Sequence, residues 1–255
     1  MDLGLAGKRA IVTGGSRGIG KATLQNLIDE GVAIATCARE ADALNTVLQV
    51  WRETDATVYG ESVDVTDEEG FADWFEQSVE QLGGLDIFVS NVSTRIHTKD
   101  IKRWQDTFEI DLLHHIRATN LALPHLRKGK DPAIVYISSI ASIMSLNMPS
   151  ETEYGAMKAA LISYGAQLAQ RIGKRNIRVN VVSPGPIHHE NGFWENIRLK
   201  RPEFYNQVAA MSVFNRLGSA QEVANAVTFL VSPAASNITG VNLRVDGGIM
   251  KTVNF

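Results

Sequence analysis

The chain has 255 residues, 44% of them hydrophobic, and a formal net charge of −3. This length permits either two small domains or one large α/β domain, and no linker or low-complexity tract divides it, so we predict one domain over residues 1–255. The charge balance gives no basic surface for nucleic acid, and no apolar stretch is long enough to span a membrane.

The cysteine content and the first residues indicate the compartment. Cys37 is the only cysteine, which excludes an internal disulfide. It lies in an apolar run and is predicted to be a small core residue rather than a nucleophile. The first residues lack the basic and apolar regions of a signal peptide, so we expect a cytoplasmic protein.

Short apolar runs alternate with longer amphipathic segments along the chain. The runs predict strands at residues 9–13, 32–37, 57–63, 85–90, 133–138, 177–182 and 242–245. The amphipathic segments predict helices at residues 18–30, 41–52, 68–82, 101–126, 152–172 and 220–231. Continuous apolar strands that alternate with helices are typical of a doubly wound parallel sheet, so we predict an α/β fold with about seven strands and helices on both faces.

The first predicted strand leads into the turn Thr-Gly-Gly-Ser-Arg-Gly-Ile-Gly at residues 13–20, followed by a helix. Glycines at such a turn let backbone N–H groups and the positive end of the helix approach a phosphate. The strand–turn–helix context favours a dinucleotide site over a turn without ligand. The residues expected to contact the cofactor here are Gly14, Ser16, Arg17, Gly18 and Ile19.

The end of the second strand bears on the choice between NAD and NADP. Proteins that prefer NAD usually carry an acidic residue about 20 positions after the glycines, where it binds the ribose 2′-hydroxyl. Ala38 occupies that position here, and Arg39 follows it. Arg17 and Arg39 could together bind a 2′-phosphate, which favours NADP(H). The alternative is that Arg39 is a solvated residue beside Glu40, with NAD as the cofactor.

Two polar motifs in the second half of the chain suggest acid–base chemistry. Tyr154 and Lys158 are four residues apart on a predicted helix and therefore share one face. A free tyrosine hydroxyl has a pKa near ~10, and a nearby ammonium group favours its ionised form, which suits proton transfer at neutral pH. Ser138 and Ser139 close the fifth predicted strand, at the sheet edge where such folds bind ligands.

These motifs resemble the short-chain dehydrogenase/reductase family, whose signatures include Thr-Gly-x-x-x-Gly-x-Gly and Tyr-x-x-x-Lys. The resemblance covers almost the whole chain and is nearest to NADP-dependent members of the 3-oxoacyl-ACP reductase and tropinone reductase type. It continues through the Asn-Val-Val-Ser-Pro-Gly-Pro-Ile segment at residues 180–187, the Arg-Leu-Gly of residues 216–218 and the Val-Asp-Gly-Gly of residues 245–248. A Rossmann-like fold is implied.

The resemblance assigns roles to individual residues. Ser139 and Tyr154 would hold the carbonyl oxygen, Tyr154 would exchange the proton, and Lys158 would also bind the nicotinamide ribose. The further residues implied as cofactor-binding are Asp64, Val65, Asn91, Pro184, Gly185 and Ile187. For Asp64, a turn or helix-cap role is the alternative.

Two positions depart from the family pattern. Asp111 stands where the family has a catalytic asparagine, and Ser93 replaces a glycine beside the cofactor. An ionised carboxylate only accepts hydrogen bonds, whereas an amide also donates them. We expect Asp111 to favour the ammonium form of Lys158 and to offset its pull on Tyr154, so that the pH optimum shifts while activity survives.

Residues 188–215 interrupt the alternation and contain many aromatic residues, which predicts an insertion that acts as a substrate lid. The alternative is that these side chains pack the insertion onto the body or form a subunit contact. Arg95, His97 and the pair His188–His189 weakly suggest a polar or anionic substrate. His114 and His115 are interpreted as surface or interface residues.

We therefore expect an NADP(H)-dependent oxidoreductase that moves a hydride between the nicotinamide and a ketone or secondary alcohol of a small molecule. The resemblance implies a homo-oligomer, most simply a tetramer. The composition predicts no binding to membranes or nucleic acid. No metal site is expected. The alternatives are an NAD-dependent alcohol dehydrogenase of the same family and a catalytically impaired NADP-binding sensor.

Overall fold

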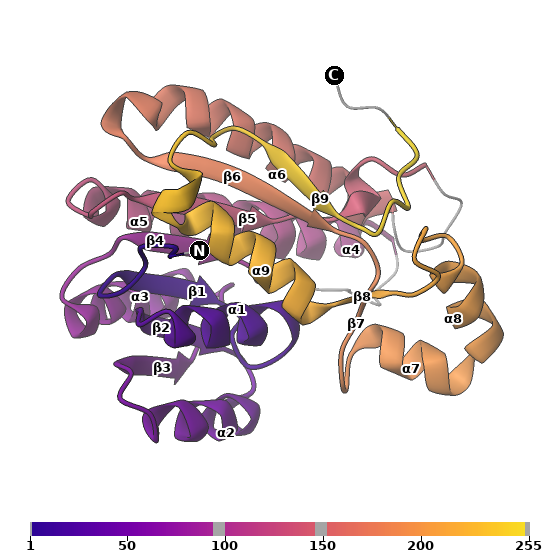
Figure 1. The fold of residues 1–255 in the computed structure, drawn as a ribbon, viewed down its shortest axis with the longest axis horizontal. Coiled ribbons are helices and arrows are strands. Elements are labelled where there is room, and N and C mark those ends of the chain that lie inside the picture. Colours follow the sequence, from indigo (N-terminus) through magenta and orange to yellow (C-terminus); the bar gives the residue numbers. More distant parts are fainter. Residues whose placement is uncertain (1, 94–99, 146–151, 253–255) are drawn as a thin grey trace.

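The protein is described here by a computed structural model in which residues 2–93, 100–145 and 152–252 are placed. Its main sheet has seven parallel strands in the order β3-β2-β1-β4-β5-β6-β9 (Figure 1). The strands are β1 (Arg9–Thr13), β2 (Ala33–Ala38), β3 (Val58–Ser62), β4 (Ile87–Ser90), β5 (Ala133–Ile137), β6 (Arg178–Pro184) and β9 (Asn242–Val245). The predicted α/β sheet of about seven strands is confirmed.

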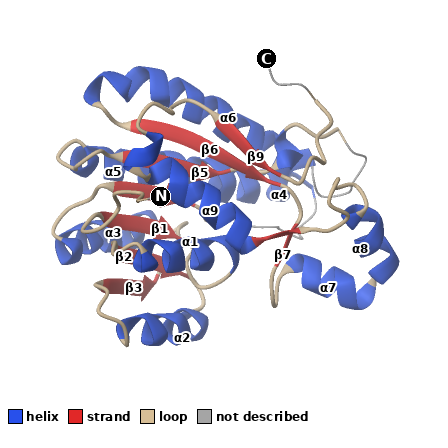
Figure 2. Cartoon of the chain, viewed as in Figure 1, coloured by secondary structure: helices blue, strands red, loops and turns tan. Residues whose placement is uncertain are grey.

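Helices cover both faces of this sheet (Figure 2). One face carries α1 (Gly18–Asp29), α2 (Ala41–Arg52) and α9 (Ala220–Val231). The other face carries α3 (Glu68–Leu82), α5 (His114–Leu126) and α6 (Thr152–Ile172). Successive side chains of a strand enter opposite cores: Ile11 packs with the second set of helices, while Ala10 and Val12 pack with the first. Among the described residues, no helix is both long and apolar enough to cross a membrane.

The prediction of one continuous α-helix over residues 101–126 is wrong, because a π-helical turn interrupts it. The structure has α4 (Asp100–Phe108), then a π-helical turn (Glu109–Leu113), then α5. A π turn inserts one extra residue into a helix and often occurs at a functional site. The apolar pattern continues across the turn, so periodicity alone does not reveal it. Asp111 lies in the middle of this turn.

The segment predicted as a lid forms a small unit beside the sheet (Figure 1). It contains β7 (Ile187–His188), α7 (Phe193–Lys200) and α8 (Pro202–Ala209), and β7 pairs in parallel with β8 (Gly218–Ser219). Its apolar residues form a separate cluster of Trp194, Ile197, Phe204, Tyr205, Val208, Ala209 and Leu217. Much of its aromatic content therefore packs within the segment itself.

A buried carboxylate anchors the amino-terminal edge of the sheet. Asp86 accepts two hydrogen bonds from the Arg9 guanidinium at 2.8 Å and one from the Lys130 backbone N–H at 2.7 Å. Burial opposes its ionisation, but these hydrogen bonds outweigh burial and lower the pKa of the Asp86 carboxyl. Because the three residues adjoin β1, β4 and β5, the anchor helps to fix the alignment of the central strands, whose opposite ends carry the site.

Candidate active site

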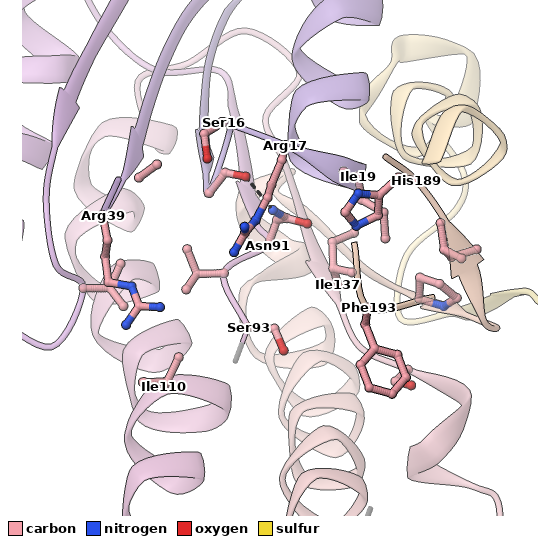
Figure 3. Close-up of a pocket in the computed structure, with 18 of the residues that line it drawn as sticks. Ser16, Arg17, Ile19, Arg39, Asn91, Ser93, Ile110, Ile137, His189 and Phe193 are labelled. Carbon is pink, nitrogen blue, oxygen red and sulfur yellow. Dashed lines mark hydrogen bonds between the residues drawn. The ribbon is translucent and has the colours of Figure 1, made fainter. Parts of the chain in front are cut away.

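A cleft of about 330 Å³ lies at the carboxyl ends of the central strands (Figure 3). β1 and β4 are neighbours there although β2 and β3 separate them along the chain, which makes this the switch point where such sheets bind ligands. Of the residues predicted to bind the cofactor, those that line the cleft are Gly14, Ser16, Arg17, Gly18, Ile19, Arg39, Asp64, Val65, Asn91, Tyr154, Pro184, Gly185 and Ile187. Lys158 is buried behind them and does not line it.

The glycine turn presents an open helix end to the cleft. α1 begins at Gly18, and its N-cap residue Arg17 makes no side-chain capping hydrogen bond. The first N–H groups of the helix are therefore available to an anion. The Asn91 side chain donates to the backbone oxygens of Thr13 and Gly14 at 3.0 and 3.2 Å, which ties the turn to the end of β4.

Two guanidinium groups reach the end of the cleft next to β2. Arg17 and Arg39 are exposed and extend into the cleft, while Ala38 at the end of β2 is buried (Figure 3). Arg17 lies 3.8 Å from Glu40, and both side chains are more than half exposed. Such an exposed pair contributes little free energy, so an incoming phosphate can compete with Glu40. The donor set suits a 2′-phosphate.

Asp64 and Cys37 lie at this end of the cleft and have structural surroundings. Asp64 accepts hydrogen bonds from the backbone N–H and hydroxyl of Thr66 at 2.9 and 2.8 Å, as a turn residue does. Burial opposes ionisation, but these bonds outweigh it and lower the pKa of Asp64. Burial raises the pKa of the Cys37 thiol to about 12. At neutral pH Cys37 is a thiol, which agrees with the predicted core role.

The two serines after β5 have different surroundings. Ser138 is buried, and its hydroxyl donates to the backbone oxygen of Lys158 at 2.9 Å, which joins β5 to α6. Ser139 lines the cleft and caps a short 3₁₀ turn (Ile140–Ser142), where its hydroxyl oxygen accepts the Ala141 N–H at 3.1 Å. That bond uses one of the two lone pairs of the oxygen and fixes its position, and the hydroxyl hydrogen of Ser139 can still be donated to a ligand.

Tyr154 lies in the first turn of α6, and Lys158 lies one turn further on. A Cβ added at Gly155 would come within 2.6 Å of the Ala141 backbone oxygen, so α6 packs directly on the turn that carries Ser139. The Lys158 Nζ lies 5.7 Å from the centre of the Tyr154 ring and donates to the Ile137 backbone oxygen at 3.1 Å. Tyr154 and Ser139 thus face one cleft with an ammonium group behind the phenol.

The two departures from the family pattern contact each other. Asp111 is fully buried, and its Oδ1 lies 3.2 Å from Lys158 Nζ. The same oxygen accepts the Ser93 hydroxyl at 2.5 Å. Among the described residues, Asp111 Oδ2 has no hydrogen-bond partner. Ser93 lines the cleft, so the Ser93–Asp111–Lys158 chain leads from the cleft wall to the buried ammonium group. Residue spacing alone does not predict the contact between Ser93 and Asp111, which are 18 positions apart.

His114 and His115 were interpreted as surface or interface residues, and this is wrong because both are buried. They enter the core directly after the π turn, where His115 Nδ1 lies 2.7 Å from the Ser90 hydroxyl. Burial lowers the pKa of His114 to about 3, with nearby Arg117 and Lys158 adding to the effect. Burial likewise lowers the pKa of His115 well below its usual value. Both are neutral packing residues at physiological pH.

His189, which together with His188 suggested a polar or anionic substrate, was not predicted to lie at the glycine turn. It lines the cleft beside the glycine turn (Figure 3). A Cβ added at Gly18 would lie 3.1 Å from its Nε2, so the ring packs against the start of α1. Arg95 and His97 lie outside the described residues. Where residues are described, no three His, Cys, Asp or Glu side chains gather as metal ligands would.

Comparison with known proteins gives matches over nearly the full length. The family model described as enoyl-(acyl carrier protein) reductase matches residues 14–250. An isoepoxydon dehydrogenase of Aspergillus clavatus is 33% identical, over 98% of this chain and 98% of that protein. The 3-oxoacyl-[acyl-carrier-protein] reductase of Escherichia coli is 34% identical, over 95% of this chain and 97% of that protein.

A solved structure with the same fold contains NADPH. L-sorbose reductase of Gluconobacter frateurii, in complex with NADPH and L-sorbose, superposes with a TM-score of 0.91 at 30% identity. The match covers 99% of this chain and 100% of that one. The similarity therefore includes the sheet, the cleft and the segment beside it.

The buried ion pair leads to a stability prediction. Lys158→Met leaves the Asp111 carboxylate buried without its cation, so we expect the free energy of unfolding to fall by about 3 kcal/mol. Adding Asp111→Asn should recover part of that loss, because the uncompensated charge is removed. Urea denaturation of the wild type, both single variants and the double variant measures the coupling.

A surface pair of the same type serves as the control. Lys102 and Asp106 form an i, i+4 ion pair at 3.0 Å on α4, with the lysine side chain 69% exposed. Lys102→Met should change the unfolding free energy by less than about 1 kcal/mol. Strictly additive effects of Lys158→Met and Asp111→Asn would contradict the ion pair.

Proposed function

The chain belongs to the short-chain dehydrogenase/reductase family, and from this premise we propose that it is an NADP(H)-dependent oxidoreductase acting on a ketone or secondary alcohol of a small molecule. One observation carries the proposal. Ser139 and Tyr154 line the same cleft as the glycine turn, and the buried Lys158 ammonium lies behind the Tyr154 ring. A phenol, a hydroxyl donor and a cation around one point suit proton transfer at a carbonyl oxygen.

The cofactor preference is argued from the adenosine end of the cleft. The uncapped start of α1 would hold the pyrophosphate, and the Arg17 and Arg39 guanidinium groups would bind the 2′-phosphate. Ala38 leaves no carboxylate at the end of β2 to repel that phosphate. Pro184, Gly185 and Ile187 form the cleft wall after β6, where the nicotinamide would lie. NADPH bound to the sorbose reductase supports this choice.

The chain's own residues would divide the chemistry among them. A bound nicotinamide would supply or accept the hydride at the carbonyl carbon. Ser139 donates its hydroxyl hydrogen to the substrate oxygen, because the oxygen of this serine already accepts the Ala141 N–H. Tyr154 gives the proton to the oxygen during reduction and removes it during oxidation. Lys158 stabilises the phenolate form of Tyr154, and Asp111 holds the lysine in place.

The alternatives weighed from the sequence can be separated experimentally. An NAD-dependent dehydrogenase would bind NADH more tightly than NADPH, and a sensor without catalysis would bind cofactor but reduce no carbonyl. The altered residues Asp111 and Ser93 motivated the sensor hypothesis. Because the two altered residues hydrogen-bond each other and hold Lys158, no observation favours lost catalysis.

We also propose a single domain, a lid role for residues 188–215 and a homo-oligomer, most simply a tetramer, located in the cytoplasm. Phe193 and Trp194 of α7 line the cleft, as expected of a lid.

The oligomer is argued from an exposed apolar face of α4. Its residues Ile101, Trp104 and Phe108 are exposed to 70%, 37% and 42%. Their spacing places them on one side of the helix, where a second subunit could cover them.

Removing the phenolic hydroxyl tests the catalytic assignment. We expect Tyr154→Phe to lower kcat for ketone reduction by at least about 100-fold, because it removes the proton donor. NADPH binding, followed by fluorescence, should persist. Tyr164→Phe is the matched control, since Tyr164 lies on α6 facing Tyr136 and does not line the cleft. Turnover that survives Tyr154→Phe would refute the mechanism.

Arg39→Ala tests the cofactor assignment. The dissociation constant for NADPH should rise about tenfold, as expected when a charge-assisted hydrogen bond to phosphate is lost, while that for NADH stays nearly constant. Arg52→Ala is the control, because Arg52 is an exposed arginine at the end of α2 away from the cleft. Titration calorimetry gives the dissociation constants of both cofactors for the wild type and the two variants. Tighter binding of NADH than of NADPH by the wild type would overturn the preference.

A further inference from the structure

A second cavity, of about 390 Å³, adjoins the cofactor cleft. Ser139, Gly185 and Trp194 line both spaces. A molecule in the second cavity therefore lies next to Ser139, which also borders the cofactor cleft. The volume lies within the range of cavities that hold small organic ligands. The carbon skeleton of a substrate would then lie in the second cavity, and its reacting oxygen would lie at Ser139, where the cavity meets the cofactor cleft.

The wall of this cavity carries no ionisable side chain among the residues that the structure describes. Its large apolar contributors are Ile140, Met144, Trp194, Val208, Met211 and Ile249. The polar side chains apart from Ser139 are hydroxyl groups only, those of Ser142, Ser145 and Thr152. Ser142 already donates its hydrogen to the Ser139 backbone oxygen at 2.5 Å, so it offers a ligand an acceptor. Within the part of the chain that the structure describes, the wall thus provides hydroxyl groups and the indole of Trp194 but no countercharge.

Hydrogen bonds join two segments of the cavity wall, the one that follows α8 and the one that follows β9. The Val213 N–H and the Ser212 hydroxyl donate to the Gly247 backbone oxygen at 2.9 and 3.0 Å. They join the segment that carries Met211 to the loop that carries Ile249. These two bonds therefore fix the positions of Met211 and Ile249 relative to each other in the cavity wall.

The histidines that suggested an anionic substrate face other groups. His188 lies 3.3 Å from Glu195 and contacts the Tyr205 ring, while His189 lies beside the glycine turn. Neither lines the second cavity. Neither imidazole is therefore placed to contact a substrate in the second cavity, and the two histidines give no support for an anionic substrate there.

We infer that the substrate is an uncharged, mainly apolar ketone or its alcohol, and that carboxylate- or phosphate-bearing carbonyl compounds are poor substrates. The inference rests on the proposed function and specifies its substrate class. Its physical basis is that a charge moved from water to a wall without a countercharge loses solvation that nothing replaces. A hydroxyl or amide group on the ketone can still meet the serine and threonine hydroxyls.

The test uses two ketones of the same shape, 4-oxocyclohexanecarboxamide and 4-oxocyclohexanecarboxylate. Their dissociation constants are measured by calorimetry on the protein saturated with NADP⁺, and kcat/KM is measured with NADPH. The neutral amide should bind and react better than the carboxylate by at least about tenfold, because only the anion loses uncompensated solvation. Equal binding, preference for the carboxylate, or binding of neither ketone would overturn the inference.

Two lysine variants locate the effect in the cavity. Met211→Lys introduces a cation at the cavity wall, whereas Val213→Lys introduces one two residues away at a side chain that is 66% exposed and does not line the cavity. Met211→Lys should raise the carboxylate-to-amide ratio of kcat/KM about tenfold, as a local countercharge would, and Val213→Lys should leave it nearly unchanged. No change in Met211→Lys, or equal changes in both variants, would overturn the cavity assignment.

Binding and turnover separate this inference from the proposed function. If the amide binds selectively but no ketone is reduced, the substrate class stands and the proposed function fails. If ketones are reduced with equal preference for both charges, the proposed function stands and the substrate class fails.

Discussion

The buried ion pair between Lys158 and Asp111 is the constraint on which the site depends. Both side chains are fully buried, and two buried charges are stable only when they are close and their remaining hydrogen-bonding groups are occupied. Lys158 Nζ meets this condition through Asp111 and the Ile137 backbone oxygen. Asp111 meets it at Oδ1, which receives the Ser93 hydroxyl, while its Oδ2 has no hydrogen-bond partner among the described residues. The pair joins α6, the π turn and the end of β5, so it fixes the cation that faces Tyr154.

The sheet topology explains why these groups meet. Parallel strands place all their carboxyl ends at one edge, and the reversal of strand order between β1 and β4 opens a cleft there. The glycine turn follows β1, Asn91 and Ser93 follow β4, and Ser139 follows β5. The π turn then directs Asp111 inward between α4 and α5. The residues proposed for proton transfer, cofactor binding and substrate placement thus share one edge of the sheet.

The sequence predicted the doubly wound parallel sheet, the glycine turn and the shared helix face of Tyr154 and Lys158, because each depends on a local pattern. It missed the π turn because the apolar periodicity runs through it unchanged. It also placed His114 and His115 at the surface, since histidine gives no signal that separates a buried ring from an exposed one. The Ser93–Asp111 contact and the position of His189 against Gly18 arise from how distant segments fold back, which residue spacing does not encode.

The pH dependence of kcat for ketone reduction by wild type and Asp111→Asn tests the central pair most directly. With the carboxylate neutralised, nothing offsets the field of the Lys158 ammonium at the Tyr154 phenol, so ionisation of the phenol becomes easier. The account predicts that the alkaline limb of the Asp111→Asn profile, where the proton donor is lost, moves to lower pH. Profiles that coincide would contradict the coupling of Asp111 to the proton path.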